Sequence, residues 1–456
     1  MAQDNHNSGR RQFLKSLGIG GASMFGMMAL EPFRAVARTT KDDAPQVGAA
    51  SGKMTYRFNR KSNDAVSLLG YGMMRLPQKD RKIDQSMVNE EVDYALAHGL
   101  NYFDTAPVYH GGRSEEALGI ALKRHPRNSF FVATKLSNFD KSQWNLESAK
   151  KMFARSLELL QVDYIDYYLL HSVGGSGPEE FERRFIDNGI VEWCQQLKKE
   201  GKIRNLGFSF HGAIDTFDFL VNNQDEFEWD FVQIQMNYID WRHADVGRGN
   251  TDAEYLLRKL EQADIQAVVM EPLLGGRLAK VTDDVKAMMQ EVRSDDSPAR
   301  WAFRWVGSHS NVLCVLSGMT TMEVLKENVE TFSPLDPCSD RENALMAKIA
   351  DIMNGVPVIP CTDCKYCMPC PQGVDIPGNF ALYNKAVNDG VLPLPDKGTA
   401  DYQQRLGKVV AMFEDGLKKK QWATKCTECD SCLPKCPQHI RIPNQMSRLV
   451  EILQKR

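Results

Sequence analysis

Asn101-Tyr-Phe-Asp-Thr-Ala-Pro-Val-Tyr109 is the stretch of sequence on which the fold assignment depends. Its apolar, β-favouring residues predict a short buried strand over 101–107, which Pro107 ends. Helical patterns lie on both sides, over 90–99 with a closing glycine and over 114–123 with acidic residues in the first turn. Strands that alternate with helices indicate a parallel sheet, and α/β barrels place their chemistry at the carboxyl ends of such strands.

Seven further segments carry a strand signal, and helical patterns such as 146–160 and 253–262 lie between them. Eight alternations of strand and helix predict a closed parallel α/β barrel of the (β/α)8 (TIM barrel) class. Residues 54–58 are a candidate hairpin strand that closes the bottom of the barrel. The expected barrel strands fall near 67–74, 101–107, 130–136, 165–172, 203–210, 231–239, 266–274 and 312–318.

The first strands of this series end in polar residues. Asp104 lies towards the end of its strand, and the next two strands finish on Lys135 and His171. Burying a lysine charge among apolar residues is costly, so Lys135 needs a partner, and Asp104 is the obvious one. Taken singly, each residue also has a structural interpretation: Tyr109 as a surface residue, the Asp–Lys pair as an ordinary ion pair and His171 as a core histidine.

The Phe-Asp-Thr-Ala-x-x-Tyr motif and these strand ends resemble the aldo/keto reductase superfamily, over roughly residues 53 to 333. Asp104, Tyr109, Lys135 and His171 match the family's catalytic tetrad in order and spacing. The resemblance implies hydride transfer between a nicotinamide cofactor and a carbonyl or alcohol carbon, with Tyr109 as general acid or base. Lys135 would lower the pKa of Tyr109, and Asp104 would hold Lys135 in place. His171 would orient the substrate oxygen.

The same resemblance extends to part of a nicotinamide site. Gln233 matches the family's amide ligand for the nicotinamide carboxamide, and Ser209 matches the serine of a Gly-x-Ser-Asn motif. Phe210 replaces the asparagine of that motif. Met270 stands where many members stack an aromatic ring on the nicotinamide, and methionine can pack on a ring face with less specific geometry.

At the adenine end, the Glu327-Asn328 pair matches the family's nucleotide loop. Gly318 and Val324 stand where NADPH-preferring members place basic residues against the 2′-phosphate. NAD(P)H is therefore an implied cofactor, but losing both charge-assisted contacts argues against an NADPH preference unless Lys326 or another base substitutes. The alternative for this segment is an ordinary strand-to-helix turn that binds nothing.

Eight of the eleven cysteines form two runs near the C-terminus, each followed by Pro-Gln-x-x-x-Ile-Pro, which makes an internal repeat. In such repeats three cysteines at two-residue spacing bind one [4Fe–4S] cluster, and the fourth, before proline, reaches the other cluster. The repeat resembles bacterial two-cluster ferredoxins over roughly residues 340 to 456. The expected ligands are Cys361, Cys364, Cys367 and Cys436 for one cluster, and Cys426, Cys429, Cys432 and Cys370 for the second.

Two features of the repeat depart from a minimal ferredoxin. Only two residues, not three, separate Cys367 from Cys370. The insert between the two runs, over 373–425, is also long, and a bend is expected within it at 392–396. Structural zinc and disulfides are the alternatives. Zinc ribbons use two cysteines per run rather than four, and disulfides at such crowded spacings would close small, strained loops. The scattered Cys194, Cys314 and Cys338 are expected to pack as buried apolar residues.

The N-terminal residues predict export. Arg10 and Arg11 precede an apolar segment over 17–30, and small residues at 35–37 offer a peptidase site. The paired arginines resemble twin-arginine (Tat) signals, although Gly9 replaces the usual serine or threonine. This route carries folded proteins, which suits one that acquires its cofactors in the cytoplasm. The apolar run is shorter than the roughly 20 residues of a spanning helix, so no permanent membrane span is expected.

Length and charge complete these expectations. A chain of 456 residues exceeds one ordinary domain. A net charge of −3 without a basic stripe argues against nucleic acid as a partner. The expected parts are a signal peptide over 1–37, a linker over 38–52, the barrel over 53–335 and a small, mainly helical ferredoxin-like domain over 336–456.

The sequence thus predicts a periplasmic or otherwise extracytoplasmic oxidoreductase that acts on a small carbonyl or alcohol, coupled to or stabilised by two [4Fe–4S] clusters. Hydride transfer moves two electrons together, whereas one cluster accepts one electron. The alternative is therefore an iron–sulfur electron-transfer protein whose barrel binds a substrate or partner without nicotinamide chemistry. A redox partner protein and the Tat export machinery are the candidate protein partners.

Overall fold

The computed structural model describes residues 53–80, 82–175, 177–212, 214–244, 251–355, 358–393 and 400–453. The predicted signal peptide and linker lie outside the described residues. In the part of the chain that is described, no helix has both the length and the apolar character needed to cross a membrane.

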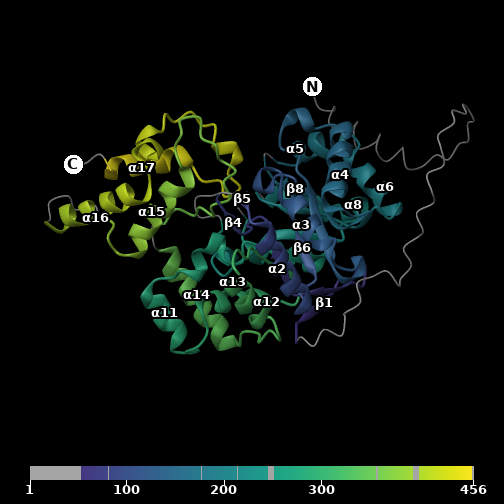
Figure 1. Ribbon diagram of the computed structural model, residues 1–456, viewed down its shortest axis with the longest axis horizontal. Coiled ribbons are helices and arrows are strands. Elements are labelled where there is room, and N and C mark those ends of the chain that lie inside the picture. The colour runs from purple at the N-terminus through teal and green to yellow at the C-terminus, as the bar shows by residue number, and fades with distance from the viewer. Residues whose placement is uncertain are drawn as a thin grey trace, which may run out of the picture. The chain divides into compact units, whose positions relative to one another are not determined.

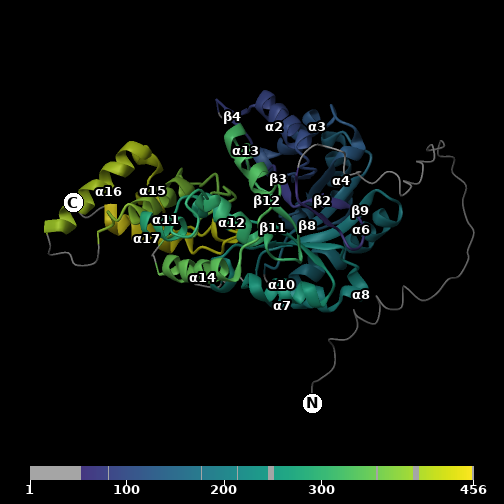
Figure 2. The same cartoon turned by 90° about the horizontal axis from the view of Figure 1, so that it is seen from below.

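Eight parallel strands close into a barrel in the order β3-β6-β7-β8-β9-β10-β11-β12, with helices outside it (Figures 1 and 2). The predicted (β/α)8 barrel is therefore confirmed. The barrel strands are β3 Leu69–Gly72, β6 Tyr102–Asp104, β7 Phe131–Leu136, β8 Ile165–Val173, β9 Ile203–Phe210, β10 Phe231–Gln235, β11 Gln266–Met270 and β12 Val312–Ser317.

Two antiparallel hairpins accompany the barrel. The first pairs β1 (Tyr56–Phe58) with β2 (Ala65–Ser67), as expected for the segment at 54–58. Arg57 in β1 donates hydrogen bonds to the carbonyls of Gly307 and His309, which precede β12, so this hairpin lies at the amino-terminal end of the barrel. The second pairs β4 (Gln78–Lys79) with β5 (Lys82–Ile83).

The sequence of α4 explains why the helices pack on the strands. Asn145 caps the first turn by accepting from the Ser148 backbone N–H, and Gln161 ends the helix in the left-handed conformation. Between them, Ala149, Phe153, Ser156 and Leu160 recur at helical spacing and are buried. The longer helices of the barrel are α2 Gln85–Ala97, α3 Ser114–Leu122, α4 Leu146–Leu160, α6 Ile190–Lys199, α7 Ile214–Asn222, α10 Ala253–Gln262, α11 Asp283–Gln290, α12 Pro298–Gly307 and α13 Met322–Thr331.

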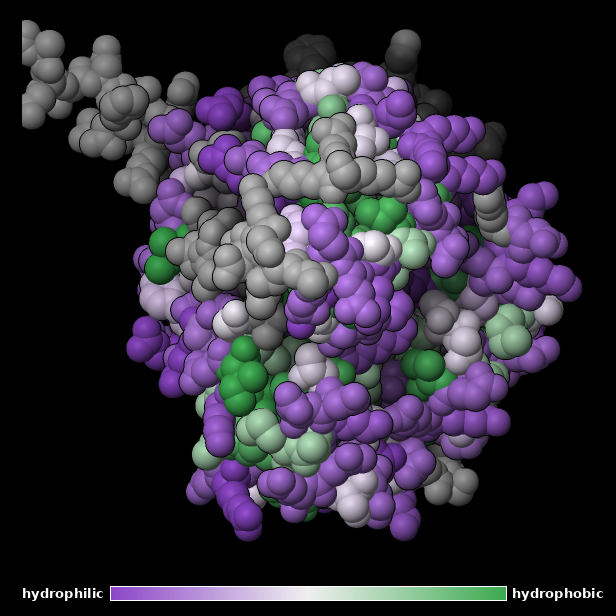
Figure 3. Space-filling model, turned by 90° about the vertical axis from the view of Figure 1, so that its left-hand side faces the viewer, coloured by the Kyte–Doolittle hydropathy of each residue, from purple (hydrophilic) through white to green (hydrophobic). Residues whose placement is uncertain are grey.

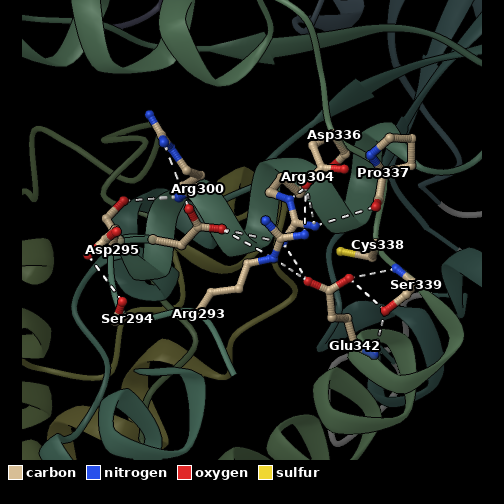
Figure 4. Close-up of polar contacts among 12 residues, drawn as sticks. Arg293, Ser294, Asp295, Arg300, Arg304, Asp336, Pro337, Cys338, Ser339 and Glu342 are labelled. Carbon is tan, nitrogen blue, oxygen red and sulfur yellow. Dashed lines mark hydrogen bonds and ion pairs between the residues drawn. The ribbon is translucent and has the colours of Figure 1, made fainter. Parts of the chain in front are cut away.

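Helix α14 (Asp340–Asn354) follows the barrel and packs on it. Its Met346, Ile349 and Met353 join the barrel's main hydrophobic core, although the sequence placed this segment with the C-terminal domain. Figure 4 shows the polar contacts at its start, where Glu342 accepts from Arg304 of α12 at 3.0 Å. Burial alone raises the pKa of Glu342, but hydrogen bonds from Arg304, Ser339 and Arg293 lower it to about 2.

The remaining chain forms a second, mainly helical core, as predicted. Its helices are α15 (Ile376–Asn388), α16 (Ala400–Gly416) and α17 (Ile442–Leu453). Phe380 and Met446 are fully buried in this core. The bend expected at 392–396 lies mostly outside the described residues. Figure 3 shows one face of the molecule, on which hydrophilic side chains predominate and hydrophobic ones occur in small groups, as on most soluble surfaces.

Candidate active site

The four side chains predicted to be catalytic meet at the carboxyl end of the barrel. Asp104 ends β6, Lys135 lies in β7, His171 lies in β8, and Tyr109 begins a short turn after β6. The Lys135 Nζ lies 2.6 Å from Asp104 Oδ1 and 5.1 Å from the centroid of the Tyr109 ring. The rings of Tyr109 and His171 are 6.0 Å apart, edge to face. All four line one cavity of about 220 Å³.

Burial controls the charges of the Asp104–Lys135 pair. Burial raises the pKa of Asp104 and lowers the pKa of Lys135, and the attraction between the two opposes both shifts. Lys135 also donates to the Thr105 carbonyl at 2.8 Å, so its ammonium is directed at two fixed acceptors. The pair is therefore held in one geometry, with its attraction strengthened by the dry surroundings.

The expected lowering of the Tyr109 pKa is wrong. Burial is the largest cause that raises the pKa of Tyr109 well above its usual value, and the nearby Tyr366 and Asp104 raise it further. The charge of Lys135 is compensated by Asp104 and does not offset the loss of water around the phenol. Tyr109 therefore remains protonated near neutral pH and is prepared to donate a proton as a general acid.

His171 is neutral in this site. Burial is the main cause that lowers its pKa well below 6.5, and the charge of Lys135 adds to the shift. Its Nδ1 is 2.6 Å from the hydroxyl of Ser137, a residue that the sequence did not single out. If the hydroxyl donates to Nδ1, the ring proton is on Nε2, and the imidazole is a hydrogen-bond donor rather than a cation.

The C-terminal domain forms one wall of the same cavity. Cys364, Tyr366, Pro437 and Gln438 line it together with the four barrel residues. The side chains of Tyr366 and Tyr109 share a hydrogen-bonding interaction. None of these contacts was predicted, because they depend on how the two parts of the chain pack against each other.

A reciprocal amide pair fixes this wall to the barrel. Gln438 Nε2 donates to Gln235 Oε1 at 2.7 Å, and Gln235 Nε2 donates to Gln438 Oε1 at 3.2 Å. Both side chains are buried, and Gln235 ends β10. Because a buried amide without partners is costly, the pair holds Gln438 over the end of this strand.

The eight clustered cysteines lie around two small cavities, and Cys367 borders both of them. The thiols of one group, which interact electrostatically with one another, are Cys361, Cys364, Cys367 and Cys436. Those of the other are Cys370, Cys426, Cys429 and Cys432. Thiolates are soft ligands that suit iron–sulfur clusters. Burial raises the pKa of Cys361 to about 11 and of Cys364 to about 12, so these thiols would lose their protons on binding metal.

Comparisons with known proteins agree with this geometry. The model of the aldo/keto reductase family matches residues 68–351, and the model of the 4Fe-4S dicluster domain matches residues 360–440. The chain belongs to the aldo/keto reductase family. It is an oxidoreductase of that family with a 4Fe-4S domain at its C-terminus.

Two relatives of this aldo/keto reductase carry the names of enzymes that act on a small carbonyl compound or on a sugar. It is 26% identical to the NADH-specific methylglyoxal reductase of Escherichia coli over 326 residues, which cover 63% of this chain and 96% of the relative. It is 25% identical to the L-galactose dehydrogenase of Arabidopsis thaliana over 287 residues, 59% of this chain and 86% of the relative.

Solved structures extend the comparison to the fold. The holo form of an aldo-keto reductase from Bacillus halodurans superposes with a TM-score of 0.53 and 25% identity, covering 65% of this chain and 96% of that one. An aldo-keto reductase of Klebsiella pneumoniae in complex with NADP and acetate superposes with a TM-score of 0.51 and 24% identity, covering 66% and 95%. Each superposition covers about two thirds of this aldo/keto reductase and nearly the whole of the solved chain.

The cofactor contacts expected for this aldo/keto reductase fall into two sets. Ser209 and Gln233 line the cavity, and the Gln233 Oε1 is buried without a hydrogen-bond partner in the described structure. That oxygen could accept from the amide of a nicotinamide or from a substrate hydroxyl. Glu327 and Asn328 are not among the cavity's lining residues. Of the four expected contacts, Ser209 and Gln233 therefore border the cavity and Glu327 and Asn328 do not.

Proposed function

We propose that this protein is an exported oxidoreductase that interconverts a small carbonyl compound and the corresponding alcohol at the mouth of its barrel. Asp104, Tyr109, Lys135 and His171 would be its catalytic residues. One observation carries the proposal: the four side chains and the wall contributed by the C-terminal domain enclose a single cavity. A protonated phenol and a neutral imidazole in that cavity are the two donors that a carbonyl oxygen requires.

In the direction of reduction, the carbonyl oxygen would accept hydrogen bonds from Tyr109 and His171. As negative charge develops on that oxygen, Tyr109 transfers its proton and the alcohol forms. Lys135 would stabilise the tyrosinate that remains, since its Nζ lies 5.1 Å from the centre of the ring. Asp104 keeps Lys135 in this position through the 2.6 Å ion pair.

The two groups of thiols would hold two [4Fe–4S] clusters, which supply one-electron transfer when bound. Export by the twin-arginine route supports this assignment, because that route moves proteins after their cofactors are in place. Fractionation of cells that express the full chain tests the route: replacement of Arg10 and Arg11 by lysine should retain the protein in the cytoplasm. Export of that variant would contradict the proposal.

The activity is tested with protein purified under anaerobic conditions, loaded with clusters and supplied with a reduced viologen and a panel of small aldehydes and ketones. We expect wild-type protein to form alcohols, and Tyr109→Phe to lose this activity while its cluster EPR signal is unchanged. Tyr94→Phe, on the outer helix α2, is the matched control and should retain the activity. Alcohol formation by Tyr109→Phe would exclude Tyr109 as the proton donor.

A second function, electron transfer without carbonyl chemistry, is favoured by one observation. Cys364, a predicted cluster ligand, lines the cavity that also contains Tyr109 and Lys135. A molecule bound there would lie next to a redox centre, whatever reaction it undergoes. The second function would be supported if a bound compound altered the cluster EPR signal in both wild type and Tyr109→Phe while neither formed an alcohol.

A further inference from the structure

We infer that the barrel cavity of the intact protein does not bind NADH or NADPH, because the loop that contains the first cysteine run packs along the path of the nucleotide's phosphates. The inference concerns the reductant for the site in the proposed function and rests on that function for the identity of the site. Four observations along the path of a bound dinucleotide support it.

The path itself follows from the order of the strands. Gln233, in β10, would bind the nicotinamide, and Asn328, in α13, would face the adenine. In the barrel β10 is followed by β11 and then β12, and α13 comes directly after β12. A molecule that touches both residues must therefore cross the loop after β11 and the end of β12. The two glycines at these places are Gly275 and Gly318.

The first of these crossings is covered by backbone. A Cβ atom built on Gly275 would lie 2.5 Å from the Thr362 Cα and 2.8 Å from the Thr362 carbonyl oxygen. Gly275 has a φ of +67°, so glycine suits this position for its conformation as well. Thr362 itself is only 2% exposed. On the Cβ side of Gly275 the two backbones are in direct contact and no phosphate group fits between them, so the space beside Gly275 is limited to the cavity that it lines.

The second crossing is covered by a side chain that is fixed at its far end. A Cβ atom on Gly318 would lie 3.1 Å from the Arg75 Cβ and 3.3 Å from its Cδ. The guanidinium of Arg75 donates to the Thr362 carbonyl and pairs with Asp363 at 3.6 Å. Arg75 therefore links the end of β12 to the same cysteine-bearing loop, and its charge is already engaged.

The groups that a pyrophosphate would need are also occupied. The backbone N–H of Gly275 donates to the carboxylate of Glu271 at 2.6 Å, so this donor is not free for a phosphate oxygen. Glu271 has a φ of +56°, which is uncommon for a residue other than glycine, and its carboxyl group lines the cavity. A pyrophosphate placed here would meet a carboxylate instead of a ring of donors.

At the adenine end the expected ligands bind other protein groups. The Asn328 amide is buried and donates to the Ser317 hydroxyl at 3.0 Å. The Glu327 carboxylate accepts from the Ser297 hydroxyl at 2.5 Å. Asn328 thus links α13 to the end of β12, and Glu327 links it to the start of α12. This agrees with the alternative that the segment is an ordinary strand-to-helix turn that binds no nucleotide.

The cavity at the four barrel residues, of about 220 Å³, suits a small molecule, and it shares Tyr109, His211 and Tyr366 with an adjoining cavity of about 1240 Å³. Conversion of a carbonyl to an alcohol consumes two electrons and two protons. Without a nicotinamide hydride, the two electrons must arrive one at a time from a low-potential one-electron donor, for which a reduced viologen substitutes in vitro. The protons come from Tyr109 and from water, so the equation remains balanced.

Binding measurements on the oxidised, cluster-loaded full chain test the inference. NADH and NADPH are titrated to about 1 mM while nucleotide fluorescence is followed, with a nicotinamide-dependent reductase as positive control. We expect no saturable binding by wild type. Saturable binding at a Kd below about 0.1 mM that Gln233→Leu weakens at least tenfold would overturn the inference. Binding that Gln233→Leu leaves unchanged lies outside the cavity and is compatible with it.

The outcome is independent of the viologen assay for carbonyl reduction. If nucleotide binds in the cavity and Tyr109-dependent reduction is also seen, the inference fails and the proposed function stands. If neither nucleotide binds and no carbonyl is reduced, the proposed function fails and the exclusion of the nucleotide stands. Hydrogen exchange over 361–366 gives a second readout, since a bound dinucleotide would have to displace this segment and change its exchange rate.

Discussion

Replacement of Lys135 by methionine is the sharpest test of the site's electrostatics. Lys135 is 1% exposed, and its Nζ lies 2.6 Å from Asp104 Oδ1. Methionine has a similar length and no charge, so the change removes the cation while leaving the cavity nearly filled. The Asp104 carboxyl group, 3% exposed, then remains in an apolar place with no partner of opposite charge.

The expected cost follows from the burial of both partners. Removing one member of a buried ion pair costs about 3–5 kcal/mol, because the other charge is left uncompensated. For a domain of this size about 1 kcal/mol shifts the melting temperature by roughly 2–4 °C, so Lys135→Met should lower it by about 6–20 °C. The double variant Asp104→Asn/Lys135→Met has no orphaned charge and should regain at least about half of this loss.

The loss should depend on pH in a defined direction. Burial raises the pKa of Asp104 above its unfolded value, and without Lys135 the opposing attraction is gone. The folded single variant then binds more protons than the unfolded chain, so its stability falls as pH rises through the folded pKa. The deficit relative to wild type should therefore be smallest below the unfolded pKa of Asp104, near about pH 4, and largest at pH 7 and above.

Circular dichroism melts of cluster-loaded protein, recorded anaerobically at several pH values, measure these differences. Wild type, both single variants and the double variant are compared under one set of conditions. A loss below about 1 kcal/mol for Lys135→Met, with no recovery in the double variant, would show that the pair is solvated, as surface pairs are. The geometry on which the catalytic assignment rests would then be wrong.

Three further predictions concern the site and its supports. The rate of carbonyl reduction should show no break near pH 6.5, because burial lowers the pKa of His171 well below that value. The rate should also show no loss up to about pH 9, because burial raises the pKa of Tyr109. A pH–rate profile with a break at 6.5 would contradict this. Gln438→Leu should cost about 1–3 kcal/mol and speed hydrogen exchange in 437–442, since Gln235 loses the amide pair and keeps only its hydrogen bond to Asp240; unchanged exchange would contradict the amide pair. Arg304→Met should cost about 1–3 kcal/mol at pH 7. The pKa of folded Glu342 is lowered to about 2, so its ion pair contributes to stability above the unfolded pKa and this contribution is lost as pH falls through about 2. The melting temperatures of wild type and Arg304→Met should therefore converge in acid. A constant difference would contradict this.

The fold and the meeting of four side chains were predictable for a topological reason. In a parallel barrel all carboxyl ends of the strands are on one side, so polar residues that end successive strands must converge wherever the loops lead. The strand assignments alone were enough to place Asp104, Lys135 and His171 together. Tyr109 could be placed with them because only a short loop separates it from its strand. The grouping of Cys370 with the second run was likewise predictable from the repeat, even though its spacing is one residue short.

The wall of the cavity could not be predicted in this way. Tyr366 and Gln438 reach the site through packing between distant segments, which leaves no periodic signal. One asymmetry in the repeat did mark Tyr366: it lies between two predicted ligands, where the second run has Ser431 at the same place. The predicted direction of the Tyr109 pKa shift was wrong for a related reason. The motif indicates the neighbouring cation, but it does not indicate how far the fold removes water from around the phenol.

The same asymmetry separates the roles of the two cysteine runs. The first run contributes Cys364 and Tyr366 to the barrel cavity, and its Cys367 is buried. In the second run Cys429 is exposed, and its hydrogen bonds with Ser431 lower the pKa of its thiol. A sequence repeat would give two equivalent sites if each run folded alone. The barrel packs against the first run and against Pro437 and Gln438 at the end of the second, so the two runs are not equivalent: Cys364 adjoins the barrel cavity, whereas Cys429 is exposed to solvent.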